Sequence, residues 1–108
     1  MDKAHTIKKN QEFENIMKTG KRNNNQFFTL YTKKPETINY RIGISVPKKL
    51  GNAVLRNKIK RQVKTILHDL SKEFPIQQDC IIIINRPFLE LSFFEKKEAI
   101  YEQKKNLE

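Results

Sequence analysis

The side chains of this sequence with the clearest chemistry are cations gathered in one stretch. No acidic residue occurs between Thr37 and His68. The stretch carries eight basic residues, which are Arg41, Lys48, Lys49, Arg56, Lys58, Lys60, Arg61 and Lys64. Apolar residues recur among the later ones at helical spacing, so the charges are expected on a folded surface rather than in a loose tail. A rigid basic surface on a small protein is suited to binding phosphate groups.

The composition of the chain favours a nucleic-acid partner. The 108 residues carry a net charge of +10, and the isoelectric point is about 9.8. A polyanion is therefore the expected partner, and nucleic acid is a commoner polyanion partner than a membrane surface. The length of the chain predicts one domain over residues 1–108.

Cysteine usage and apolar stretches predict the compartment. Cys80 is the only cysteine, so the chain cannot form an internal disulfide. It begins an apolar run, where a buried structural thiol is expected. The first residues lack the apolar run of a signal peptide, and no stretch approaches the roughly 20 apolar residues of a membrane span. These features predict a cytoplasmic protein without a membrane partner.

Catalytic residues do not converge in the sequence. Glu95, Glu98 and Glu102 can share a helix surface, but four lysines surround them, and a solvated face is the better interpretation. His5 and His68 have no partners at metal-ligand spacing. The three glycines of the chain cannot build a phosphate-binding loop. The sequence therefore predicts a binding surface without catalytic or metal-ligating residues of its own.

One helix is expected to position most of the cations. Gly51 and Asn52 offer a turn and an N-cap for it. An apolar stripe suited to a core follows, formed by Leu55, Ile59, Val63, Ile66, Leu67 and Leu70.

The polar residues of this helix divide between three sides. One flank carries Arg56, Lys60 and Lys64, the face opposite the core carries Asn57, Arg61 and His68, and the other flank carries Lys58. Glutamate partners four residues away, which ordinarily neutralise a solvated helix, are missing. The outer surface of the helix is therefore expected to be almost wholly cationic.

The remaining elements form a sheet and two further helices. A helix is expected over residues 10–18, with Gly20 as its C-terminal cap, and residues 21–25 are interpreted as a polar turn. Strands are expected over residues 26–32, 40–46 and 79–85. The last strand contains four consecutive isoleucines, so it is expected in the middle of the sheet with both faces buried.

A capping box predicts the start of the last helix. Ser92 and Glu95 have the required spacing of three residues. This helix is expected to carry four apolar residues, which are Phe93, Phe94, Ile100 and Tyr101.

A second candidate surface combines aromatic side chains with a cation. Alternation along the strands places Phe27 and Tyr31 on one face beside Arg41, with Phe13 and Met17 of the first helix alongside. Aromatic rings next to a cation are suited to stacking unpaired bases and holding their backbone. Ordinary packing between the first helix and the sheet is the alternative, and for Phe13 and Met17 the two interpretations are even.

The run Lys-Lys-Leu-Gly-Asn-Ala-Val-Leu-Arg-Asn-Lys-Ile-Lys-Arg, residues 48–61, resembles the signature of a known family, the protein subunit of bacterial ribonuclease P. In that signature a lysine pair and Gly-Asn-Ala-Val lead into an Arg-Asn-Arg stretch. The resemblance continues through residues 8–13, 26–31, 41–46 and 81–86, so it covers nearly the whole chain.

The resemblance implies a fold. It is an α+β fold, a single-domain two-layer α/β sandwich with the order α-β-β-β-α-β-α, similar to domain 2 of ribosomal protein S5. A helix would cross between parallel strands with left-handed connectivity, against the usual right-handed rule.

The resemblance also implies a function. In that family the RNA subunit is the catalyst and requires Mg²⁺, and the protein helps it cleave precursor tRNA endonucleolytically to create the mature 5′ end. The basic helix would bind the catalytic RNA, and a cleft between the first helix and the sheet would hold the single-stranded 5′ leader. The expected partners are ribonuclease P RNA and precursor tRNA, with one monomeric copy of the protein per RNA and no cofactor held by the protein.

Carried over by position, the site residues form two groups. Contacts with the catalytic RNA are expected from Lys48, Lys49, Asn52, Arg56, Asn57, Lys58, Lys60, Arg61 and Lys64. Contacts with the leader are expected from Phe13, Met17, Phe27, Tyr31 and Arg41. The chain departs from the family pattern at Lys58, where an arginine is usual, and at Met17, where an aromatic residue is frequent.

Two other functional classes compete with this interpretation. A ribosomal or other structured-RNA protein with the same fold would bind RNA without any nuclease role. A self-sufficient RNA hydrolase would need clustered carboxylates, which the sequence does not offer.

Overall fold

The computed structural model describes residues 5–6, 10–34, 41–73 and 79–106, and all their side chains except those of residues 5, 6, 10, 12, 41, 71–73 and 104–106. The strands are β1 (His5–Thr6), β2 (Lys21–Asn24), β3 (Phe28–Lys33), β4 (Arg41–Ser45) and β5 (Asp79–Ile84). The helices are α1 (Asn10–Thr19), α2 (Ala53–Glu73) and α3 (Phe93–Asn106), with short 3₁₀ helices η1 (Lys48–Leu50) and η2 (Arg86–Glu90).

The five strands form one sheet with the order β1-β4-β5-β3-β2. The isoleucine strand β5 lies in the middle, as its composition predicted. It runs parallel to β4 and antiparallel to β3. The chain between the parallel neighbours β4 and β5 contains α2, so the basic helix is attached to the sheet at both of its ends.

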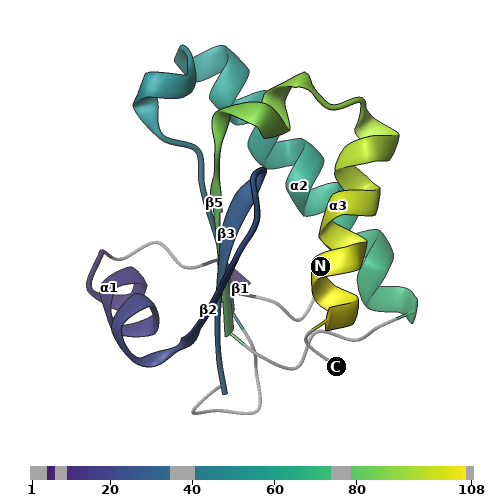
Figure 1. Ribbon diagram of the computed structural model, residues 1–108. Coiled ribbons are helices and arrows are strands. Elements are labelled where there is room, and N and C mark those ends of the chain that lie inside the picture. The colour runs from purple at the N-terminus through teal and green to yellow at the C-terminus, as the bar shows by residue number, and fades with distance from the viewer. Residues whose placement is uncertain (1–4, 7–9, 35–40, 74–78, 107–108) are drawn as a thin grey trace.

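Helices cover the two faces of the sheet unequally. Helices α2 and α3 lie side by side on one face, and α1 lies on the other (Figure 1). The larger core joins Ile82 and Ile84 of β5 to α2 and α3. A smaller cluster joins Ile81 and the partly buried Ile83 to Ile16 of α1. The expected α+β class is confirmed, and the two expected layers are the sheet and the α2–α3 pair, to which α1 adds partial cover on the second face.

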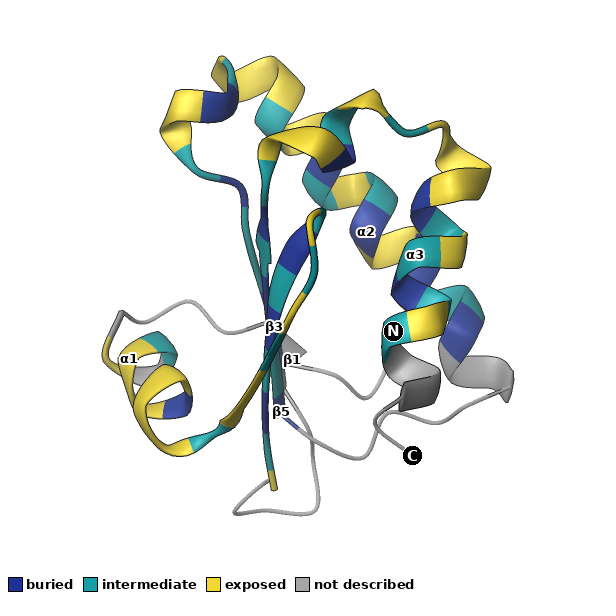
Figure 2. Ribbon diagram, viewed as in Figure 1, coloured by how far each residue is buried: buried dark blue, intermediate teal, exposed yellow. Residues whose placement is uncertain are grey.

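The predicted apolar stripe of α2 faces the larger core along most of its length. Five of its members are buried, which are Ile59, Val63, Ile66, Leu67 and Leu70 (Figure 2). The prediction was wrong for Leu55, which is 37% exposed because it lies in the first turn of the helix and its side chain covers Gly51. The core contact of α2 therefore begins at Ile59.

The last helix begins as predicted but packs differently. The Ser92 N–H donates to the Glu95 carboxylate at 2.9 Å, and the Glu95 N–H donates to the Ser92 hydroxyl at 3.2 Å. Lys96 and Ile100, four residues apart, point inward, and this phase turns Phe94 outward to an exposure of 66%. Of the four apolar residues of this helix, Ile100 is buried and Tyr101 packs against the larger core, while Phe93 and Phe94 are exposed.

The capping box of α3 has a consequence for pH. The hydrogen bond from the Ser92 backbone holds the pKa of Glu95 below its ordinary value, and the bond between the two side chains lowers it further. The cap therefore stabilises the fold above the ordinary pKa of a glutamate and loses its effect as pH falls through the lowered value.

Two short segments are strands that the residue pattern did not locate, although the order implied by the family resemblance contained three strands before the basic helix. Residues 21–25 were expected to form a turn, but Lys21–Asn24 is the edge strand β2, which pairs antiparallel with β3. All of its residues are polar, so it lacks the apolar alternation that marks a strand. Strand β1 pairs in parallel with Arg41 and Ile42 of β4.

The position of Phe27 also differs from the prediction. It precedes β3 and packs against the larger core. The Asn25 side-chain oxygen accepts hydrogen bonds from the N–H groups of Phe27 at 2.8 Å and Phe28 at 3.0 Å, which forms a tight turn before the strand. Phe27 therefore does not share the face on which Tyr31 lies with Phe13 and Ile16.

Gly20 follows α1 for a reason other than the one expected. Gly20 does not adopt the left-handed conformation, so the expected left-handed cap is absent. A Cβ at Gly20 would instead lie 2.5 Å from the Thr32 carbonyl oxygen and 2.6 Å from the Ile16 carbonyl oxygen. Glycine is required here because α1 and β3 approach each other through backbone atoms.

Gly20→Ala should lower the free energy of unfolding by about 1–3 kcal/mol, since the backbone must move to admit the methyl group. Urea unfolding followed by circular dichroism measures the loss. Gly51→Ala is the matched control, because its Cβ would meet only the side chain of Leu55, with Cδ2 at 2.5 Å, and the end of that flexible side chain can turn away. Equal losses in the two variants would contradict this account.

Candidate nucleic-acid interface

The basic helix α2 begins at a side-chain cap. The Leu55 N–H donates to Oδ1 of Asn52 at 2.9 Å, and the Arg56 N–H donates to the Asn52 carbonyl at 3.0 Å. The cap stabilises the first turn and fixes the direction in which the following cations project. The predicted N-cap is confirmed, and the amide oxygen of Asn52 is occupied by the helix.

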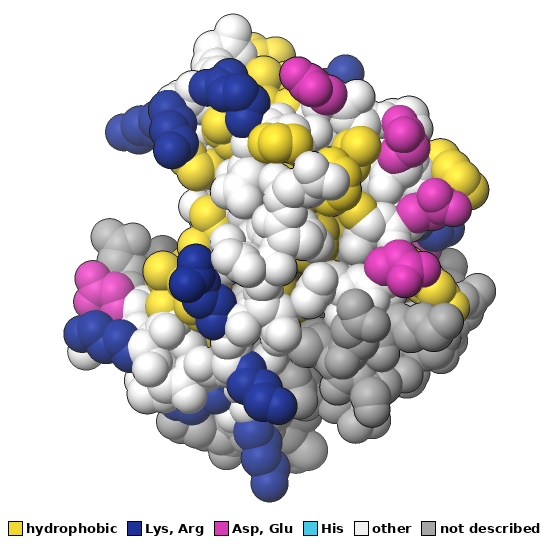
Figure 3. All heavy atoms as spheres, viewed as in Figure 1, with side chains coloured by type: hydrophobic (Ala, Val, Ile, Leu, Met, Phe, Trp, Pro, Cys, Tyr) yellow, Lys and Arg dark blue, Asp and Glu magenta, His cyan; other side chains and the backbone are white. Residues whose placement is uncertain are grey.

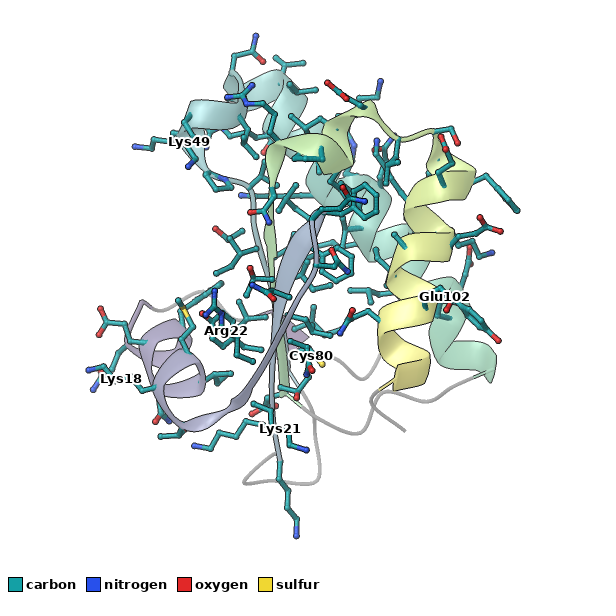
Figure 4. The ribbon with its side chains drawn as sticks, viewed as in Figure 1. Lys18, Lys21, Arg22, Lys49, Cys80 and Glu102 are labelled. Carbon is teal, nitrogen blue, oxygen red and sulfur yellow. The ribbon has the colours of Figure 1, made fainter. Side chains whose placement is uncertain are left out.

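Most of the residues expected to meet the catalytic RNA lie on one exposed surface, which we call the α2 face. Its exposed members are Lys48, Lys49, Asn52, Asn57, Lys58, Arg61 and Lys64. Arg86 steadies its loop by donating from Nη2 to the Lys49 carbonyl at 3.1 Å. The Lys49 side chain extends away from the body of the protein (Figure 4). Asp69 near the helix end, 3.9 Å from Lys97 Nζ, is turned toward α3.

Arg56 and Lys60 belong to the flank of α2 and are half-buried. Nε of Arg56 is shielded from solvent and has no hydrogen-bond partner among the described residues. A buried donor without an acceptor costs free energy, so this guanidinium has binding capacity that the described chain does not use.

A hollow of about 350 Å³ lies beside the end of β4, between α1 and α2. Its walls are formed by Phe13, Glu14, Ile44, Ser45, Val46 and Lys60. On this side of the molecule, hydrophobic side chains lie between groups of basic ones (Figure 3). The hollow therefore combines an aromatic ring from α1 with a cation from α2, which the sequence had assigned to two different surfaces.

The other residues of the predicted aromatic surface are only partly brought together. Phe13 and Tyr31 both pack on the smaller cluster around Ile16 and Ile81, so each has a structural role as well. Met17 is 37% exposed on α1. Arg41 begins β4, but its side chain lies outside the described part of the chain.

Arg22 is a residue of this surface that the sequence did not reveal. The register of β2 and β3 places it directly opposite Tyr31. The Arg22 side chain lies on the side of the sheet that α1 covers (Figure 4). It supplies the cation beside the aromatic ring that was expected from Arg41. It was missed because its segment was interpreted as a turn, and side chains in a turn do not alternate between the two faces of a sheet.

The described residues offer little for metal ligation or membrane insertion. Within them, no three histidine, cysteine, aspartate or glutamate side chains are grouped so that they could hold a metal ion. The helices of the described chain are all too short or too polar to span a bilayer. The described surface instead presents a basic face and an adjoining hollow with an aromatic residue in its wall.

Comparison with known proteins identifies the family of the chain. The profile of the family named Ribonuclease P matches residues 1–108 of this chain. The chain belongs to the ribonuclease P protein family. The ribonuclease P protein component of Bacillus cereus is 44% identical over 101 residues, which cover 93% of this chain and 88% of that protein. The component from Bacillus anthracis is 43% identical over a stretch that covers 93% of this chain and 85% of that protein.

Solved structures of ribonuclease P proteins share the fold. The Staphylococcus aureus protein superposes with a TM-score of 0.87 at 37% identity, covering 98% of this chain and 97% of that one. The Thermotoga maritima protein gives a TM-score of 0.85 at 27% identity, covering 96% of this chain and 98% of that one. The α2 face and the hollow are therefore features of a chain that matches ribonuclease P proteins over nearly its full length.

The N-cap of α2 allows the structural role of Asn52 to be separated from contact with RNA. Asn52→Ala should lower the free energy of unfolding by about 1 kcal/mol, because the Leu55 N–H loses its acceptor. Asn52→Asp retains the acceptor and should keep the stability, but its negative charge should weaken RNA binding. Urea unfolding and a filter-binding assay with ribonuclease P RNA measure the two effects. Equal RNA affinity of Asn52→Asp and the wild type would place this position away from the RNA.

Proposed function

We propose that this chain acts in a ribonuclease P holoenzyme by binding both the catalytic RNA and the 5′ leader of precursor tRNA. Its role is to assist endonucleolytic removal of that leader, which creates the mature 5′ end. The observation that carries the proposal is the hollow between Phe13 and Lys60, which adjoins the cationic α2 face. One small protein thus presents two different RNA-binding chemistries side by side.

The α2 face is suited to a structured RNA. Its cations project from a rigid helix, so little backbone freedom is lost when they contact phosphates. Neutralised phosphates release counterions, which makes such binding strong and dependent on salt. The half-buried Arg56 adds the positive charge of its guanidinium from the flank of the same helix.

The hollow and the Arg22–Tyr31 pair are suited to a single strand. Unpaired bases stack on aromatic rings, and adjacent cations hold the backbone between them. Phe13 and Lys60 offer this combination at the edge of β4, and Tyr31 with Arg22 offers it on the neighbouring strands. A leader that passes α1 would contact both pairs while the body of the substrate lies on the catalytic RNA.

In this proposal the RNA subunit carries out the cleavage and binds the Mg²⁺ that the reaction requires. The protein supplies positive charge that reduces the repulsion between two RNA molecules, so that fewer metal ions are needed for their association. One monomeric copy of the protein acts with each RNA in the cytoplasm.

Reconstitution at low magnesium concentration tests the proposal. The protein mixed with Bacillus cereus ribonuclease P RNA should increase the cleavage of a precursor tRNA with a long leader well above the rate of the RNA alone. The gain should shrink when the leader is shortened to one nucleotide. An absence of any gain would refute the proposal. RNA binding that ignores leader length would favour a general structured-RNA-binding protein, and cleavage by the protein alone would reveal a hydrolase.

Arg22→Gln should weaken the affinity of the holoenzyme for a leader-bearing precursor by about 2- to 5-fold, the contribution of an exposed cation beside a ring. Affinity for mature tRNA should not change. Lys21→Gln is the matched control, because Lys21 stands opposite Thr32, whose side chain points to the other face of the sheet. Equal effects of the two variants would remove Arg22 from the leader path.

A further inference from the structure

Lys96 is a cation buried between two helices. It lies in α3, and its side chain is only 5% exposed. Its Nζ donates a hydrogen bond of 2.8 Å to Oε1 of Gln62 in α2. The same Nζ lies 5.6 Å from the centre of the Phe88 ring. The ammonium group is therefore held in a defined position at the seam between α2 and α3.

No carboxylate balances this charge among the described side chains. The neighbouring Glu95 carboxylate turns back to the start of α3, where it accepts from the Ser92 N–H at 2.9 Å. Asp69, seven residues after Gln62 in α2, is 3.9 Å from Nζ of Lys97 instead. A buried cation without a counter-ion is costly, because neither water nor an anion stabilises it.

A second cation approaches the same place from α2. Lys58 precedes Gln62 by four residues, so the two side chains lie on one side of the helix. Burial lowers the pKa of Lys96 below the ordinary value of a lysine, and the positive charge of Lys58 lowers it further. Two ammonium groups from different helices thus repel each other beside the exposed α2 face.

We infer that Lys58 and Lys96 bind one phosphate group of the RNA that occupies the α2 face. Lys58 contacts it from the exposed side, and Lys96 contacts it from the wall of the seam. Gln62 holds Nζ of Lys96 in place for this contact. The phosphate supplies the counter-ion that the described protein lacks and removes the repulsion between the two lysines. This inference rests on the proposed function, and it extends the RNA-binding surface from α2 onto α3.

RNA is favoured over a free anion because of what surrounds the pair. Lys58 is part of the continuous α2 face, on which Asn57 and Arg61 are also exposed. A phosphate at the seam would therefore belong to a backbone that other residues of the same helix contact. A small free anion would contact only the two lysines, and its attraction to the other cations of the α2 face would be screened by solvent.

The salt dependence of RNA binding tests the contact directly. Lys96→Met keeps the apolar packing on Phe88 but removes the charge. In binding to Bacillus cereus ribonuclease P RNA, the slope of log affinity against log salt concentration should fall by about 0.7–0.9, the loss of one phosphate contact. Lys97→Met is the matched control, because Lys97 is next in sequence but faces Asp69, and its slope should stay at the wild-type value. An unchanged slope for Lys96→Met would overturn the inference.

A second variant shows whether both lysines hold the same phosphate. Lys58→Met lies at an exposed position, so the fold is retained, and its slope should fall as that of Lys96→Met does. The double variant should lose little more than either single variant, because the phosphate is held only when both lysines are present and is lost with either one. Fully additive losses would place the lysines on separate phosphates and overturn the inference.

A spectroscopic measurement tests the inference even if Lys96→Met does not fold or the proposed function is wrong. In NMR spectra of isotope-labelled lysine side chains, bound RNA should raise the pKa of Lys96 in the intact protein, since an anion stabilises the ammonium form. If the wild type does not bind ribonuclease P RNA, the proposed function fails. Inorganic phosphate then tests the seam alone, and it should shift the Lys96 signal in the wild type but not in Lys58→Met. No shift with either probe would overturn the inference.

Discussion

Burial of both faces of β5 is the constraint on which the two RNA-facing surfaces depend. Ile82 and Ile84 pack toward α2 and α3, while Ile81 and Ile83 pack toward α1. Because successive strand residues alternate between faces, one short strand anchors helices on both sides of the sheet. The relative placement of α1 and α2, and hence the hollow between them, follows from contacts made by neighbouring residues of a single strand.

Charge and core are separated along α2 with little overlap. The buried stripe from Ile59 onward faces the sheet, and the cations occupy the remaining surface of the helix. The flank residues Arg56 and Lys60 stand between these regions, and there the cations come closest to apolar walls. Lys96 takes this position on α3. Cations with apolar surroundings interact more strongly with phosphate than fully solvated ones, because less water screens the charge.

Features set by local sequence were predictable, and features set by contacts between distant segments were not. The apolar period of α2, the Asn52 cap and the Ser92–Glu95 capping box each depend on residues within one or two turns, and each is present. Strand β2 could not be recognised, because its polar residues become a strand only through pairing with β3. For that reason Arg22 was missed.

The sequence did not show which side of α3 faces the core or which residues meet in the hollow. Its aromatic residues suggested an inner face that Lys96 in fact shares with Ile100. A sequence cannot distinguish a solvated lysine from one that lies against a ring of another segment. The place of Lys60 in the hollow has the same origin, since the wall opposite it comes from α1, more than forty residues earlier.

The described pairing between β1 and the outer edge of β4 is short. β1 pairs only with Arg41 and Ile42, and within the described chain no strand covers the edge from Gly43 to Ser45. An open strand edge can pair with the edge of another molecule and lead to aggregation. Lys60 shares the hollow with Ile44 and Ser45 of this edge, so two copies that approach each other there bring like charges together. Positive charge beside a strand edge thus disfavours pairing between copies, in addition to suiting the protein to phosphate.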